Sequence, residues 1–120
     1  MKDADLKRRT KAFALDVIEF FEELPKDEVA RVLGRQLLRV GTSVGANYRA
    51  AKRAKSPADF ISKMGTVEEE ADERGYWLEL LVDSGRASAS RAMPLLQVAD
   101  ELVAISVSSI NTARKSARKL

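Results

Sequence analysis

The sequence contains no cysteine and no histidine. Without cysteine there is no disulfide, no thiol nucleophile and no thiolate ligand for a metal. Without histidine the chain lacks the commonest general base and the commonest zinc ligand. No constellation typical of a hydrolase or an oxidoreductase remains. We therefore expect a protein that is not an enzyme and that holds no metal and no cofactor.

Long apolar runs are also missing. No apolar run approaches the length of about 18 residues that a membrane span needs. The first five residues, Met1–Asp5, become charged at once and do not form the apolar region of a signal peptide. These features predict a soluble cytoplasmic protein without a membrane partner.

Only three prolines are present, Pro25, Pro57 and Pro94, and they lie about 30 residues apart. The segments between them are rich in strong helix formers, and the alternating pattern of strands is absent. Short links between helices of similar length favour antiparallel neighbours. We therefore predict one all-α domain over residues 1–120, an antiparallel up-down-up-down four-helix bundle with helices at about 5–24, 27–55, 57–84 and 91–117.

Each predicted helix carries one apolar stripe at spacings of three, four and seven residues, which is the pattern of a helix packed on a core. Pro25 is expected to end the first helix, Ser56 to cap the third, and Gly85 to take a left-handed conformation after it. The expected core residues are Leu6, Phe13, Val17, Phe20 and Leu24; Val29, Leu33, Leu37, Val40, Val44, Asn47 and Ala51; Phe60, Met64, Val67, Ala71, Leu78 and Val82; and Leu95, Ala99, Leu102, Ser106, Ile110 and Ala113.

Charge is sorted by segment although the net charge is only +3. Residues 26–55 carry eight Lys/Arg against two acids, and residues 57–86 carry eight Asp/Glu against three bases. A basic helix face that stays free attracts phosphate, whereas one that lies beside an acidic helix satisfies itself. The candidate phosphate-binding residues are Arg31, Arg35, Arg49, Lys52 and Arg53 on the second helix and Arg114, Lys115, Arg118 and Lys119 at the chain end.

Three glycines, Gly34, Gly41 and Gly45, lie beside the core stripe of the second helix, with Leu38 close by. Glycine inside a helix costs about 1 kcal/mol relative to alanine, and the close approach of another backbone is the usual reason for it. The neighbour is either another helix of the same bundle or a second subunit. In the second case Leu38, Gly41 and Gly45 belong to an oligomer interface.

Tyr76, Trp77 and Leu80 lie opposite or at the border of the core stripe of the third helix. An aromatic and aliphatic cluster of this kind is typical of a partner contact. The alternative is an irregular bundle in which a neighbouring helix covers it. We expect an oligomer interface that includes these three residues.

The acidic run from Glu68 to Glu73 does not predict a metal site. Carboxylate bundles that bind two metals need acids from several helices together with Glu-x-x-His pairs. We expect instead that Glu69 or Glu73 pairs with Arg39, or with Ser43 and Asn47, on the facing helix. Such a pair fixes helix register more than it adds stability.

Three stretches resemble the four-helix-bundle proteins associated with intervening sequences of bacterial large-subunit ribosomal RNA. They are Leu24–Glu28, Gln36–Arg39 with Gly41–Ala51, and Ser56–Met64 continued by Glu69–Glu73 and Tyr76–Leu81. The resemblance implies a bundle that assembles as a homopentameric ring, without an established enzymatic activity. It also implies polar contacts between the second and third helices at Arg39, Ser43, Asn47 and Glu73.

A related group, the accessory proteins of diversity-generating retroelements, is similar in fold and works with a reverse transcriptase and nucleic acid through a basic surface. Members of that group are more basic than this chain. Two functional hypotheses follow. The first is an oligomeric accessory protein that binds the phosphate backbone of RNA or DNA and works with a protein such as a reverse transcriptase. The second is a scaffold whose basic and acidic faces serve self-assembly alone.

Overall fold

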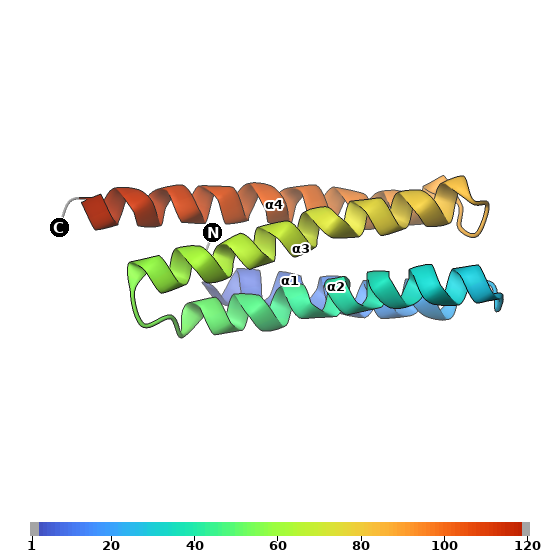
Figure 1. Ribbon diagram of the computed structural model, residues 1–120, viewed down its shortest axis with the longest axis horizontal. Coiled ribbons are helices and arrows are strands. Elements are labelled where there is room, and N and C mark those ends of the chain that lie inside the picture. The colour runs from blue at the N-terminus through green and yellow to red at the C-terminus, as the bar shows by residue number, and fades with distance from the viewer. Residues whose placement is uncertain (1–2, 119–120) are drawn as a thin grey trace.

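The computed structural model describes residues 3–118, which form four antiparallel helices and no strand (Figure 1). The helices are α1 (Asp3–Glu22), α2 (Glu28–Lys52), α3 (Pro57–Asp83) and α4 (Ala89–Arg118). The molecule is a rod of 54 × 21 × 20 Å. The predicted fold class, an all-α four-helix bundle, is confirmed.

The helix ends follow local sequence signals. Ser56 Oγ accepts a hydrogen bond from the Asp59 N–H at 3.1 Å, and Pro57 occupies the first helical position of α3. Gly85 has a φ of 79°, the left-handed conformation expected after α3. α4 begins at Ala89, two residues earlier than predicted, because Ser88 Oγ accepts from the Arg91 N–H at 3.2 Å and caps it.

Asp27 has two roles at the start of α2. Its carboxylate accepts from the Ala30 N–H at 2.9 Å and from Arg86 Nε at 3.0 Å. The first bond caps α2, and the second ties its start to the connection between α3 and α4. The Ala30 N–H and the Arg86 guanidinium hold the pKa of the Asp27 carboxyl below its ordinary value of 3.8.

This lowered pKa predicts a specific acid sensitivity. The stabilisation from Asp27 is fully present above pH 3.8 and is lost as the pH falls through the folded-state pKa, because the protonated carboxyl loses its charge-assisted bonds. Asp27→Asn should therefore unfold at a urea midpoint that changes less between pH 5 and pH 3 than that of the unmodified chain. Asp16→Asn, at an exposed position on α1, is the control and should leave the pH dependence unchanged. An unaltered acid profile in Asp27→Asn would contradict the assignment.

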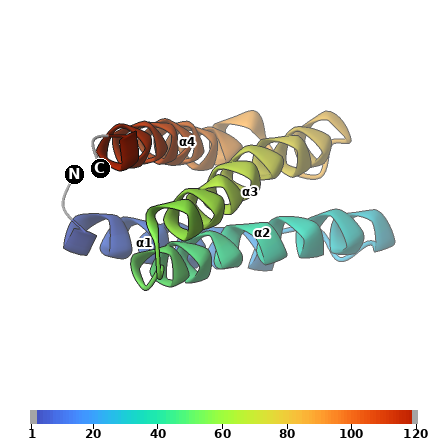
Figure 2. The same ribbon diagram turned by 60° about the vertical axis from the view of Figure 1, so that its left-hand side comes forward.

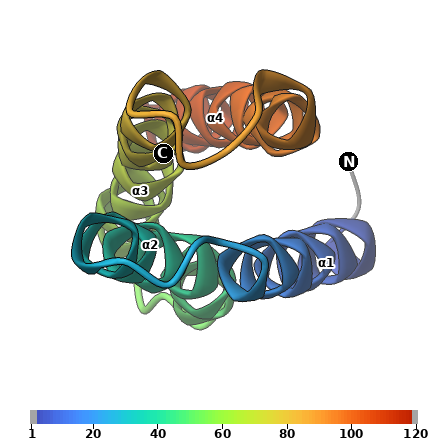
Figure 3. The same cartoon turned by 90° about the vertical axis from the view of Figure 1, so that its right-hand side faces the viewer.

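Consecutive helices make most of the contacts, so α2 packs against both α1 and α3, while α1 and α4 meet over the smallest area (Figures 2 and 3). Because α2 packs against two helices, more of its circumference is buried than one apolar stripe predicts. Ala30, Gly34, Gly41 and Tyr48 are buried in addition to the predicted stripe. The prediction that Val29 belongs to the core is wrong, since 43% of this residue is exposed.

α4 contains a long apolar window. By length and composition alone it could span a membrane, which is weak evidence because a core helix passes the same test. In the bundle it packs along α3 and contributes six buried residues, Ala92, Leu95, Ala99, Leu102, Ser106 and Ile110. Only 28% of its apolar window is buried in the bundle, so this packing accounts for part of its apolar composition.

Candidate nucleic-acid interface and subunit contacts

The basic residues predicted on α2 are all exposed. Arg31 pairs with Glu28 at 3.3 Å on its own helix. Arg35, Arg49 and Arg53 make no ion pair with any residue in the 3–118 range that the structure describes. The acidic residues of α3 therefore do not neutralise these three guanidinium groups.

The basic residues at the end of α4 lie in its last two turns. Arg114, Lys115 and Arg118 are exposed, and Lys119 lies outside the described residues. Lys115 and Arg118 stand in the final turn of the helix, where cations interact favourably with the helix dipole.

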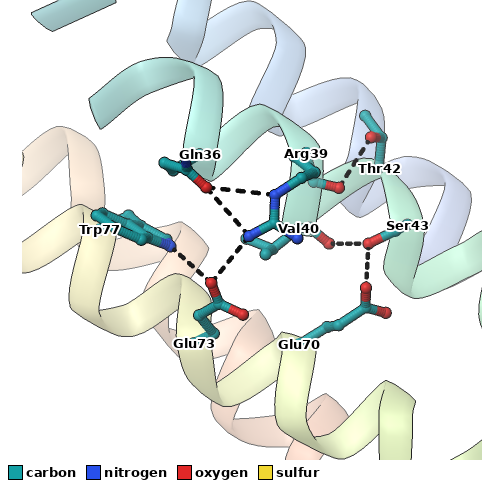
Figure 4. A network of polar contacts seen from close by, with 8 residues as sticks. All are labelled: Gln36, Arg39, Val40, Thr42, Ser43, Glu70, Glu73 and Trp77. Carbon is teal, nitrogen blue, oxygen red and sulfur yellow. Dashed lines mark hydrogen bonds and ion pairs between the residues drawn. The ribbon is translucent and has the colours of Figure 1, made fainter. Parts of the chain in front are cut away.

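A polar network joins α2 to α3 at their middles (Figure 4). Arg39 Nη2 lies 3.0 Å from Glu73 Oε1, and the same oxygen accepts from Trp77 Nε1 at 3.2 Å. Gln36 Oε1 accepts from the Arg39 guanidinium at 3.1 Å. The predicted contact of Arg39 with Glu73 is therefore present, and within the described chain it is the one ion pair between α2 and α3.

The second acid of this contact is Glu70, not Glu69. Glu70 accepts from Ser43 Oγ at 2.5 Å and from Asn47 Nδ2 at 2.6 Å, whereas Glu69 is exposed. One residue corresponds to a rotation of about 100° around the helix, and it is Glu70 and Glu73 that share the side facing α2. Asn47 consequently lies at the edge of the core with its amide on Glu70.

The three glycines of α2 face α1 of the same chain. A Cβ atom on Gly41 would lie 2.8 Å from both methyl carbons of Val17, and a Cβ on Gly45 would lie 3.3 Å from Thr10 Oγ1. The neighbour that approaches these glycines is therefore a helix of the same bundle, which was the first of the two alternatives. The close approach at Gly41 and Gly45 is thus made by α1, and their contact with a second subunit stays a prediction.

The predicted aromatic cluster is partly covered by its own chain. Tyr76 is 55% exposed, while Trp77 and Leu80 are half-buried, as is Leu38 of the other predicted contact. The Tyr76 and Trp77 rings lie edge to face at 5.0 Å between centroids. Because Arg39 faces Glu73 and the helices are antiparallel, the exposed Val32 lies level with Leu80. Val32, Tyr76, Trp77 and Leu80 form what we call the α2–α3 patch.

The sequence pattern also hid a buried cation, Arg74. Its side chain is fully buried, its three nitrogens have no hydrogen-bond partner among residues 3–118, and its guanidinium lies 4.4 Å from the centroid of the Phe13 ring. Burial lowers the pKa of Arg74 to about 10, although Asp100 and Asp72 oppose this shift. The group is thus charged at neutral pH. The sequence did hold a signal for this burial, because position 74 lies between Ala71 and Leu78 on the same apolar stripe.

The described carboxylates do not gather into a metal site. Within residues 3–118 no group of three or more Asp or Glu side chains is arranged to hold a metal ion. The acids of α3 are used for helix contacts, as Glu70 and Glu73 show, or point into solvent.

Comparison with known proteins gives a family and a solved relative. Residues 2–108 match the model of the family described as 23S rRNA-intervening sequence protein. A crystal structure of a protein with unknown function from the S23 ribosomal protein family of Bacteroides thetaiotaomicron is 34% identical, with a TM-score of 0.81. The match covers 87% of this chain and 96% of that one. No curated protein matches the chain.

Proposed function

The chain belongs to the 23S rRNA-intervening sequence protein family, and from this premise we propose that it is a non-enzymatic, cytoplasmic accessory protein that binds the phosphate backbone of RNA or DNA. In this proposal it acts as a homo-oligomer, a pentamer, and works beside a protein partner such as a reverse transcriptase. The single observation that carries the nucleic-acid role is the exposed row of Arg35 and Arg49 on α2 and Arg53 at its C-terminal cap, which form no ion pair with the acidic helix α3 within residues 3–118.

Unpaired surface arginines favour phosphate over base recognition. Exposed guanidinium groups on a rigid helix attract phosphate oxygens and release condensed counterions, a term that is independent of sequence. The exposed aromatic residue Tyr76 lies on α3, so this face offers no stacking platform for bases. Several copies in one oligomer would multiply weak contacts through avidity.

Salt dependence tests the proposed binding. The purified protein should bind labelled RNA or DNA at about 50 mM salt and should lose most of its affinity by about 200 mM, because the interaction is a counterion-release effect. Fluorescence anisotropy across that range measures the slope. Absence of binding at about 50 mM salt would remove the nucleic-acid role.

The second candidate function is a protein-interaction scaffold, and the α2–α3 patch favours it. Val32 and Tyr76 expose more than half of their surface on neighbouring helices, beside the half-buried Trp77 and Leu80. An exposed apolar patch of this kind is a typical contact between proteins. In this alternative the patch supports self-assembly and the basic residues have no nucleic-acid role.

A charge placed in the α2–α3 patch tests self-assembly. Tyr76→Glu combined with Leu80→Glu should convert the oligomer into a monomer of 13.3 kDa, because each carboxylate would have to be desolvated in the interface. Light scattering gives the solution mass. Met93→Glu with Val107→Glu, at exposed apolar positions of α4, is the matched control and should keep the mass of the unmodified protein. Equal masses for both variants would contradict the assigned interface.

A further inference from the structure

Folding sorts the charges of this chain by the two ends of the rod. The start of α1, the end of α2, the start of α3 and the end of α4 lie together at one end (Figure 1). We call this end, residues 3–12, 43–67 and 105–118, the basic end. It carries twelve Lys/Arg and three Asp/Glu. The remaining described residues, 13–42 and 68–104, form the acidic end, with seven Lys/Arg and fifteen Asp/Glu.

The acidic end pairs four of its seven cations with its own acids. Four of its arginines form ion pairs, and Arg74 is buried. The pairs are Arg31 with Glu28, Arg39 with Glu73, Arg86 with Asp27 and Arg91 with Glu23. Lys26 and Arg35 are the cations left exposed without an ion pair in the described part of this end.

The basic end leaves most of its cations free. Arg8 pairs with Asp5, Lys63 with Asp59, and Arg9 with Glu101. Eight further cations are exposed and have no ion pair among residues 3–118; they are Lys7, Lys11, Arg49, Arg53, Lys55, Arg114, Lys115 and Arg118. The field of the molecule is therefore positive at this end and negative at the other, and an anion is steered to one end only.

A groove between α1 and α2 lies at the inner border of the basic end and reaches Ala14 and Thr42 just beyond it. It has a volume of about 360 Å³, and its walls carry Lys11 on α1 and Arg49 on α2. The other lining residues are short, namely Thr10, Ala14, Thr42, Gly45 and Ala46. Lys7 and Arg53 continue the two rows of cations one turn further, because residues four apart share a helix face. Short side chains between cationic walls let an extended anionic chain come close to both helices.

We propose that phosphate-backbone binding is confined to the basic end, with the backbone lying in the groove between Lys11 and Arg49, and that Arg31 and Arg35 take no part in it. The inference rests on the proposed function and narrows it. It adds Lys7 and Lys11 of α1 to the interface, and it removes two of the α2 arginines that a single basic face would include.

Two variants with equal loss of charge test this placement. Lys11→Gln with Arg49→Gln changes the basic end, and Arg31→Gln with Arg35→Gln changes the acidic end. The probe is a fluorescein-labelled single strand of about 20 nucleotides, as RNA and as DNA. The basic-end variant should bind at least about tenfold more weakly at 50 mM salt, and its log–log salt slope should fall by about 1.4 per binding chain. The acidic-end variant should stay within about twofold of the unmodified protein.

The possible outcomes distinguish the claim that the protein binds nucleic acid from the claim that it does so at the basic end. Equal weakening in both variants, or a larger effect at the acidic end, overturns the placement while binding itself stands. No binding by the unmodified protein at about 50 mM salt overturns the proposed function and the placement together. If the basic-end variant loses helicity in circular dichroism, Arg53→Gln with Lys115→Gln replaces it, and the same weakening is expected.

Discussion

Replacing Arg74 with methionine is expected to raise the free energy of unfolding by about 2 kcal/mol, although it removes a charged group from the centre of the bundle. The guanidinium is fully buried and none of its nitrogens has a hydrogen-bond partner within the described chain. Burial lowers its pKa to about 10 even though Asp100 and Asp72 oppose the shift, so desolvation disfavours the charged form. Methionine fills a similar volume and keeps an unbranched, adaptable shape against Phe13.

Urea denaturation of Arg74→Met at pH 7 measures this effect. Arg35→Met makes the same chemical change at an exposed arginine without an ion pair in the described chain, so it should alter stability by less than about 0.5 kcal/mol. A loss of stability in Arg74→Met would contradict the prediction. It would mean that the contact with the Phe13 ring and the fields of Asp100 and Asp72 outweigh desolvation.

Replacing Gly41 with valine is expected to lower the free energy of unfolding by about 3 kcal/mol. A Cβ atom at this position would lie 2.8 Å from both Val17 methyl carbons and 3.1 Å from the Val17 Cβ. Val17 is fully buried and β-branched, so it has little freedom to rotate away. α1 would have to move off α2, and the packing of both helices would suffer.

Two further variants separate crowding from helix propensity. Gly65→Ala adds a Cβ that meets no atom within 4 Å, and it should stabilise the protein by about 1 kcal/mol through helix propensity alone. Adding Val17→Ala to Gly41→Val should recover part of the loss, giving a coupling of about 1 kcal/mol or more. Additive effects at the two positions would contradict the contact. Thermal or urea unfolding is measured for the unmodified chain, Gly65→Ala, Gly41→Val, Val17→Ala and the double variant.

Helix type and helix ends could be predicted from the sequence because their causes are local. Ser56 caps α3 within three residues, Gly85 takes its left-handed conformation directly after it, and apolar spacing marks each buried stripe. The contact of Arg39 with Glu73 could also be predicted, since both helices and both faces were evident. Which of Glu69 and Glu70 contacts Ser43 could not be predicted, because adjacent residues point about 100° apart around the helix and a small error in its rotation exchanges them.

The glycines show where a sequence pattern predicts a close contact without naming the neighbour. Gly34, Gly41 and Gly45 predicted that another backbone comes near α2, but a second subunit and a helix of the same bundle would leave the same pattern. The structure places Val17 and Thr10 of α1 beside Gly41 and Gly45. Which helix fills a groove depends on contacts between residues far apart in the chain, and these are decided by packing as a whole.

The amino-acid sequence by itself determined four helices in up-down order, their apolar stripes and the two ends of α3, since each depends on residues within a turn or two of one another. Only the tertiary structure decided that Arg74 is buried in the core, that four arginines at the acidic end of the rod are paired, and that Arg49, Arg53, Arg114 and Arg118 at the basic end form no ion pair within the described residues. The reason is that burial and ion pairing depend on which side chains meet across helices, so a charge balance taken along the chain does not show which cations remain available to a partner.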